Sequence, residues 1–164
     1  MDTPLVSVVM GSDSDMEIMG EAVTILKSFA IPYEVRISSA HRTPRRTAQF
    51  AQNAKNRGIR VIIAGAGFAA HLAGVIAAET TLPVIGVPID SSTLQGLDAL
   101  LSTVQMPGGI PVATMSIGKS GARNAGLYAA QILALSNTAL EKKIIAYRKN
   151  MEKSVVQKDR SIKK

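Results

Sequence analysis

Cysteine is absent from this chain of 164 residues, and so is tryptophan. Without a thiol the chain can form no disulfide, no thiolate metal site and no cysteine nucleophile, so a reducing compartment is the simplest expectation. Only 4% of the residues are aromatic, and a hydrophobic core must therefore be built mainly from Val, Ile, Leu and Ala.

Long hydrophobic runs are also missing. The longest, residues 61–70, is far shorter than the ~20 residues needed to span a bilayer. The N-terminal residues show no basic region followed by an apolar stretch, so no signal peptide is predicted. We expect a cytoplasmic protein that makes no membrane contact.

The positive charge of the chain lies almost entirely at its C-terminal end. The formal net charge is +7, yet residues 1–140 contain ten basic and nine acidic side chains, whereas residues 141–164 contain nine and three. Because the body is nearly neutral, nucleic-acid binding is not expected, and the basic end is interpreted as a solvated helix end. We predict a single domain over residues 1–153 and a basic tail over residues 154–164. A non-catalytic protein that binds nucleotides or polyanions is the less favoured alternative.

Short β-branched runs alternate with longer helical segments along the body. Strands are predicted at residues 5–10, 33–37, 61–64, 84–87 and 112–116. Helices are predicted at residues 15–29, from 44 onward, and at 69–79, 94–105, 118–135 and 138–153. Strands that are apolar throughout and alternate with helices indicate a parallel sheet covered on both faces. We therefore predict an α/β fold, a three-layer doubly wound parallel sheet of the flavodoxin-like type, with a C-terminal helix.

Ligands of such folds bind at the carboxyl ends of the strands, so the polar loops after the first four strands should converge on one rim. The first of these loops reads Gly-Ser-Asp-Ser-Asp, residues 11–15. Its free backbone N–H groups and the hydroxyls of Ser12 and Ser14 favour an anion, and Asp15 can accept hydrogen bonds from ribose-type hydroxyls. Simple capping of the following helix would use the same residues.

The loop after the second strand reads Ser-Ser-Ala-His-Arg-Thr-Pro, residues 38–44, and holds one of the two histidines of the chain. Histidine is the side chain whose proton moves near neutral pH, which makes His41 a candidate general acid and base. The guanidinium of Arg42 can donate two parallel hydrogen bonds to a phosphate or a carboxylate. Together they indicate an enzyme acting on a small phosphorylated metabolite. The other histidine, His71, enters an apolar helix and is expected to be half-buried and hydrogen-bonded.

Motifs for cofactors and metals are incomplete. Residues 65–70 match G-x-G-x-x-A, but they follow the third strand and lack an acidic residue about 20 positions later. Residues 118–120 read Gly-Lys-Ser, but the first glycine of a phosphate loop falls on Ala113. The two histidines have no ligand partner at helical spacing. Neither a cofactor nor a metal is therefore expected.

Within the helix predicted at residues 118–135, the stretch 122–135 is apolar around much of the helix circumference. An outer helix of a doubly wound fold should present a polar face to water, so this pattern favours contact with another subunit.

Seven segments, taken together and in order, resemble the PurE family of purine biosynthesis. They are MGSDSD at 10–15, SAHRTP at 39–44, IAGAG at 63–67, AAHL at 69–72, IGVP at 85–88, GLDALL at 96–101 and VQMP at 104–107. The resemblance implies an isomerase, forming a homo-octamer, that converts 5-carboxyamino-1-(5-phosphoribosyl)imidazole to 5-amino-1-(5-phosphoribosyl)imidazole-4-carboxylate. Within the family, Arg42 and the His71-Leu72 pair favour this mutase branch. The alternative is the branch that carboxylates aminoimidazole ribonucleotide directly with CO2.

The family pattern also implies roles for individual residues. Those expected to bind the phosphoribosyl part are Ser12, Ser14, Asp15 and Arg42, and those expected to complete the substrate site are Ser39, Ala66, Gly67 and His71. The unstable carbamate substrate further suggests a transient link to the ATP-dependent synthetase that forms it. Two positions depart from the pattern, since Phe68 stands where the family usually has Gly and Ala73 where it usually has Pro.

Overall fold

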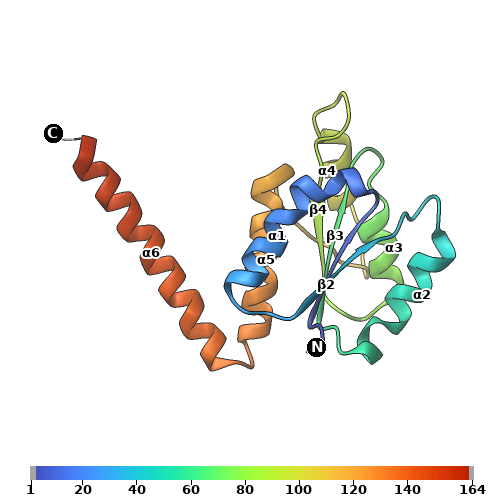
Figure 1. Ribbon diagram of the computed structural model, residues 1–164. Coiled ribbons are helices and arrows are strands. Elements are labelled where there is room, and N and C mark those ends of the chain that lie inside the picture. Colours follow the sequence, from blue (N-terminus) through green and yellow to red (C-terminus); the bar gives the residue numbers. More distant parts are fainter. Residues whose placement is uncertain (1–2, 163–164) are drawn as a thin grey trace.

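The β-branched runs form a five-stranded sheet in which every strand is parallel to its neighbours, in the order β2-β1-β3-β4-β5 (Figure 1). In this computed structural model, which describes residues 3–162, the strands are β1 (Val6–Met10), β2 (Tyr33–Ile37), β3 (Val61–Ala66), β4 (Val84–Pro88) and β5 (Ala113–Thr114). The order is that of flavodoxin-like folds, so the predicted fold is confirmed. The terminal residues 1, 2, 163 and 164 of the predicted domain and tail lie outside the described residues.

Helices cover both faces of the sheet. They are α1 (Met16–Ser28), α2 (Pro44–Ala54), α3 (Leu72–Glu79), α4 (Leu97–Val104), α5 (Gly118–Ala134) and α6 (Thr138–Ile162), with two short 3-10 turns, η1 (Asp13–Asp15) and η2 (Lys55–Arg57). Figure 1 shows α1 and α5 side by side against one face and α2 and α3 against the other, while α6 leaves the body as an arm.

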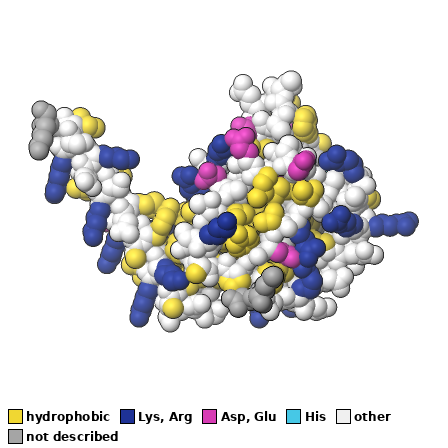
Figure 2. All heavy atoms as spheres, viewed as in Figure 1, with side chains coloured by type: hydrophobic (Ala, Val, Ile, Leu, Met, Phe, Trp, Pro, Cys, Tyr) yellow, Lys and Arg dark blue, Asp and Glu magenta, His cyan; other side chains and the backbone are white. Residues whose placement is uncertain are grey.

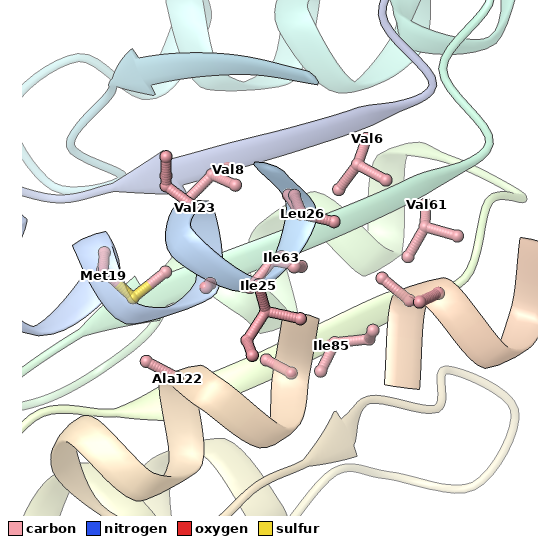
Figure 3. Close-up of a cluster of buried hydrophobic side chains, with 14 of the residues drawn as sticks. Val6, Val8, Met19, Val23, Ile25, Leu26, Val61, Ile63, Ile85 and Ala122 are labelled. Carbon is pink, nitrogen blue, oxygen red and sulfur yellow. The ribbon is translucent and has the colours of Figure 1, made fainter. Parts of the chain in front are cut away.

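Alternating side chains of the central strands divide the core into two layers. Val6 and Val8 of β1 point toward α1 and α5, where they join Ile63 of β3 in the larger cluster (Figure 3). Val9 and Ile62 point the other way and pack among the residues of α2 and α3. All five side chains are fully buried, which explains why these strands read as continuous apolar runs.

Close packing of α1 on α5 depends on Gly126. A Cβ atom at this position would lie 2.9 Å from the backbone oxygen of Ala22 and 2.9 Å from Cβ of Ile25. We expect Gly126→Ala to lower the free energy of unfolding by about 1–3 kcal/mol, because the two helices must move apart. Gly20, on α1, has no atom within 4 Å of such a Cβ, so Gly20→Ala should raise it by about 0.5–1 kcal/mol. Urea unfolding of both variants measures the contrast, and equal effects would contradict this account.

Glu34 ties the edge strand β2 to the rest of the fold. Its carboxylate accepts two hydrogen bonds from Arg57, at 2.9 and 2.8 Å, and one each from Arg36 and Ser7. Partial burial raises the pKa of Glu34, but the hydrogen bonds from Arg57, Arg36 and Ser7 outweigh this and hold the pKa at about 2, below the ordinary 4.5.

A pKa lowered by folding means that Glu34 stabilises the fold when it is ionised. The contribution is complete above pH 4.5 and is lost as the pH falls toward about 2. Because the ion pair keeps some solvent contact, we expect Glu34→Gln to cost only about 1–2 kcal/mol at pH 7. Urea unfolding at several pH values should show parent and variant converging at the acidic end. A difference that is independent of pH would contradict the assignment.

Several predicted boundaries were wrong near the rim of the sheet. Strand β3 continues to Ala66 because Gly65 and Ala66 still pair with β4. Helix α3 starts at Leu72 rather than at residue 69, since residues 68–71 form tight turns whose N–H groups bond two residues back. Helix α1 starts one residue late, after η1, and α4 starts at Leu97, after a turn with positive φ at Gln95 and Gly96.

The last two elements also differ from the prediction. Strand β5 is limited to Ala113 and Thr114, although the N–H of Met115 still bonds to the Gly86 oxygen of β4, and the chain enters α5 at Gly118. Helix α6 runs to Ile162 instead of residue 153, since neither Gly nor Pro interrupts residues 154–162. No helix within residues 3–162 combines the length and the apolar character needed to cross a bilayer.

Candidate active site

A pocket of about 510 Å³ lies at the carboxyl ends of β1, β2 and β3. It sits where the strand order reverses around β1, which is where ligands of doubly wound folds bind. All nine residues singled out in the sequence line it: Ser12, Ser14, Asp15, Ser39, His41, Arg42, Ala66, Gly67 and His71. Gly11, Ala40, Phe68, Ala69 and Leu72 complete the lining.

The loop after β4 reaches the same rim, as predicted, but does not line this pocket. It packs instead behind the loop after β3. A Cβ on Gly67 would lie 1.8 Å from Oγ of Ser91 and 3.2 Å from the backbone oxygen of Ile89. The β4 loop therefore supports the pocket floor without reaching the ligand space.

The loop after β1 contributes a buried carboxylate and two serine hydroxyls to the pocket. Asp15 is buried, and its Oδ2 accepts a hydrogen bond from the Ser12 backbone N–H at 3.1 Å. Burial raises the pKa of Asp15, although backbone hydrogen bonds from Ser12 and Gly11 oppose the shift. The Ser14 hydroxyl donates to Oγ of Ser12 at 3.0 Å. These contacts hold two hydroxyls at the pocket wall, where they can turn to a ligand oxygen.

Arg42 joins the first two loops. Its Nη2 donates to the backbone oxygen of Gly11 at 3.2 Å, while its backbone N–H and its Nε donate to Oγ of Ser39, at 3.2 and 3.4 Å. The loop itself is anchored below by a buried 2.8 Å hydrogen bond between the hydroxyls of Ser38 and Thr47. The guanidinium is exposed to the pocket and retains free N–H groups for an anion.

His41 and His71, thirty residues apart, form a hydrogen-bonded pair. The distance from His41 Nε2 to His71 Nδ1 is 2.9 Å, and the two rings meet edge to face. His71 Nδ1 also lies 2.6 Å from the backbone oxygen of Ala69. The prediction of a half-buried His71 was wrong: the side chain is exposed, because the turn at residues 68–71 lifts it out of α3 and toward His41.

The backbone oxygen of Ala69 assigns the tautomers of this pair. A carbonyl oxygen only accepts hydrogen bonds, so Nδ1 of His71 must carry its proton. When His41 is neutral, its Nε2 then accepts from His71 and its own proton is on Nδ1. His71 thereby fixes the orientation of the His41 ring.

The pocket combines a proton-transfer group, a cation and several hydroxyls. This set suits proton movement on a substrate that carries a phosphate and sugar hydroxyls. Within residues 3–162 no three His, Asp or Glu side chains are grouped as metal ligands would be.

Two parts of the pocket were missed by sequence reasoning. Leu72 and Ala40 contribute apolar lining, which no motif distinguishes from ordinary core residues. The backbone oxygens of Gly11 and Ala69 position Arg42 and His71, and backbone groups leave no trace in residue identity.

Comparisons with known proteins give a consistent result. A model of the AIR carboxylase family matches residues 5–154. The N5-carboxyaminoimidazole ribonucleotide mutase of Synechocystis sp. is 55% identical over 162 residues, which are 99% of this chain and 91% of that protein. The N5-carboxyaminoimidazole ribonucleotide mutase of Bacillus subtilis is 56% identical over 154 residues, which are 94% of this chain and 95% of that protein. A crystal structure of Treponema denticola PurE superimposes with a TM-score of 0.87 at 29% identity, over 98% of this chain and 99% of that one.

Proposed function

Because this chain belongs to the AIR carboxylase family, we propose that the pocket at the ends of β1, β2 and β3 is the active site of its reaction, with His41 as general acid and base. The family resemblance read from the motifs is confirmed, and the chain is an enzyme. It is an isomerase of purine biosynthesis that moves a carboxylate of N5-carboxyaminoimidazole ribonucleotide from the exocyclic nitrogen to ring carbon C4.

The contact between His41 and His71 is the observation that carries the proposed mechanism. Proton transfer needs a group that can give a proton and take it back at one place. His41 is such a group, and the pair fixes its ring, since His41 Nε2 lies 2.9 Å from His71 Nδ1, which the Ala69 oxygen in turn holds. We assign His41 the catalytic role, and His71 acts through it as a positioning residue.

The reaction then proceeds in three steps with no net gain or loss of atoms. The imidazolium form of His41 protonates the carbamate nitrogen and becomes neutral, so that the bond from nitrogen to the carboxyl carbon breaks and CO2 is released within the pocket. The electron-rich C4 of the aminoimidazole attacks this CO2 and forms the new C–C bond. Neutral His41 finally removes the C4 proton and returns to the imidazolium form. No electrons are exchanged, and no step requires ATP.

The phosphoribosyl part is assigned to residues of the loops after β1 and β2. Arg42 and the hydroxyls of Ser12 and Ser14 supply cationic and neutral donors for the phosphate, while the Asp15 carboxylate can accept from ribose hydroxyls. Ser39 and the backbone of Ala66 and Gly67 are assigned to the carboxylate side.

A comparison of two substrate sets tests this function. Purified enzyme should convert N5-carboxyaminoimidazole ribonucleotide rapidly and aminoimidazole ribonucleotide plus bicarbonate only slowly, measured as formation of the C4 carboxylate. The opposite preference would favour direct carboxylation on the same scaffold.

The arm formed by α6 supports the proposed homo-octamer. Of residues 138–162 only Leu140 is buried, and Figure 2 shows Lys and Arg side chains spaced along the arm with hydrophobic groups between them. Met151, Val155 and Ile162 are 47%, 66% and 82% exposed. A groove of about 290 Å³ between α5 and α6 is lined by further apolar side chains, including Met115, Leu127, Ile144 and Tyr147. Light scattering should give about eight times the chain mass of 17.3 kDa.

We also propose that the enzyme is located in the cytoplasm, as expected for a chain without cysteine.

A further inference from the structure

Phe68 differs from the other phenylalanines of the chain. The chain has three, of which Phe29 packs against the Tyr147 ring at 5.7 Å between centroids, and Phe50 lies under the guanidinium groups of Arg36 and Arg57. Phe68 is 60% exposed, and no ring contact involves it in the part of the chain that the structure describes. Yet it lines the pocket of His41 and Arg42. A large apolar ring is thus held at the mouth of a polar site.

The backbone at Phe68 is strained. Its φ is +54°, in the left-handed region that costs an L-residue with a Cβ and that glycine adopts freely. The neighbouring turns fix this conformation, because the N–H of Ala70 bonds to the oxygen of Phe68 and the N–H of His71 to that of Ala69, at 2.9 and 2.8 Å. Gly67 is in turn confined by the loop after β4. A left-handed residue at an active site is a reason to ask what its side chain does there.

The proposed reaction gives such a ring a task. Between the breaking of the N–C bond and the formation of the C–C bond, CO2 is free and uncharged, so neither Arg42 nor the serine hydroxyls can retain it by charge. The pocket of the single chain is open, with His41, Arg42 and His71 all exposed. An apolar group over the imidazole ring would exclude water from the freed CO2 and so help to retain it.

We propose that Phe68 is this cover: its ring packs over the bound imidazole and keeps the released CO2 within the pocket until C4 captures it. The inference rests on the proposed function of the same site. An aromatic ring can stack on the imidazole of the substrate at little cost in side-chain entropy, and Phe68 lines the same pocket as the proposed proton-transfer group His41. The backbone strain at Phe68 is then maintained for function.

Three variants separate the ring from the backbone. Phe68→Gly removes the ring and the strain, Phe68→Ala removes the ring and keeps a Cβ at positive φ, and Phe68→Tyr keeps the ring. Each is supplied with N5-carboxyaminoimidazole ribonucleotide in labelled bicarbonate with carbonic anhydrase. Mass spectrometry gives the labelled fraction of the C4-carboxylated product, and chromatography gives the aminoimidazole ribonucleotide that escapes after losing CO2.

We expect the Gly and Ala variants to raise both quantities by roughly tenfold, which corresponds to about 1.4 kcal/mol of lost contact, while the Tyr variant stays near the parent. Phe68→Gly should melt no lower than the parent, since glycine relieves the strain, and this excludes misfolding as the cause. If the labelled fraction and the escape of aminoimidazole ribonucleotide are unchanged in the Gly and Ala variants, the inference is overturned, even if their rates fall. If the parent enzyme makes no C4-carboxylated product, the proposed function and this inference both fail. If the parent is active but the Gly and Ala variants show the same labelled fraction and the same escape of aminoimidazole ribonucleotide, only the inference fails.

Discussion

Replacing His41 by Asn should lower kcat by about 10²–10⁴-fold, because the reaction loses the group that protonates nitrogen and deprotonates C4. The KM should change little, since the anion-binding groups are left in place. The side chain is exposed and is not part of either core cluster, so the melting temperature should be close to that of the parent. Steady-state rates on the carbamate substrate, with a thermal melt of each protein, provide the measurement. A variant that retains a tenth or more of the parent kcat would remove His41 from the mechanism.

His71→Asn provides the matched comparison. If His71 only positions His41, its loss should reduce kcat less than the loss of His41 does, and should shift the pH dependence of kcat, because the proton site on His41 is no longer held by a fixed donor. Loss of activity at every pH with an unchanged profile would instead indicate a merely structural role for His71.

The second large effect is expected at Arg42. Arg42→Ala should raise the KM by roughly 10- to 100-fold with a smaller change in kcat, because a charge-assisted contact to the phosphate is lost while His41 remains. Arg42→Lys should recover only part of the loss, since an ammonium cannot reproduce two parallel hydrogen bonds. Initial rates over a range of substrate concentrations separate the two constants.

Arg45 offers a control for general electrostatics. It lies three residues further on, is exposed, and does not line the pocket. Arg45→Ala removes the same charge from the same region and should leave the KM near that of the parent. If the KM rises equally in both variants, the positive charge of the loop as a whole attracts the substrate, and specific hydrogen bonds from Arg42 do not.

The elements that carry the site were predictable because their causes are local in the sequence. The runs around Val8 and Ile63 are apolar on both sides, as strands of a covered parallel sheet must be, and Pro44 marks the start of α2. Once the strands are parallel, the loops that contain Ser12 and His41 must follow neighbouring carboxyl ends. The shared position of nine pocket residues follows from topology more than from any one motif.

The features that were missed depend on contacts between distant parts of the chain. The pairing of His41 with His71 joins two loops thirty residues apart, and nothing in the identity of a phenylalanine predicts the positive φ of Phe68 in the turn before His71. The link from Glu34 to Arg57 joins residues 23 positions apart and is invisible to helical or strand spacing. The length of α6 was underestimated because residues 154–162 are all exposed, so no core pattern marks the end of the helix.

The fate of the carboxyl carbon tests the central claim most directly. Enzyme is given substrate labelled with carbon-13 at the carbamate carboxyl group, in excess unlabelled bicarbonate, and the product is followed by NMR in the parent and in His41→Asn. We predict that the label appears at the C4 carboxylate in the parent and that the variant forms almost no product. Product without the label, or label transferred equally well without His41, would contradict the account.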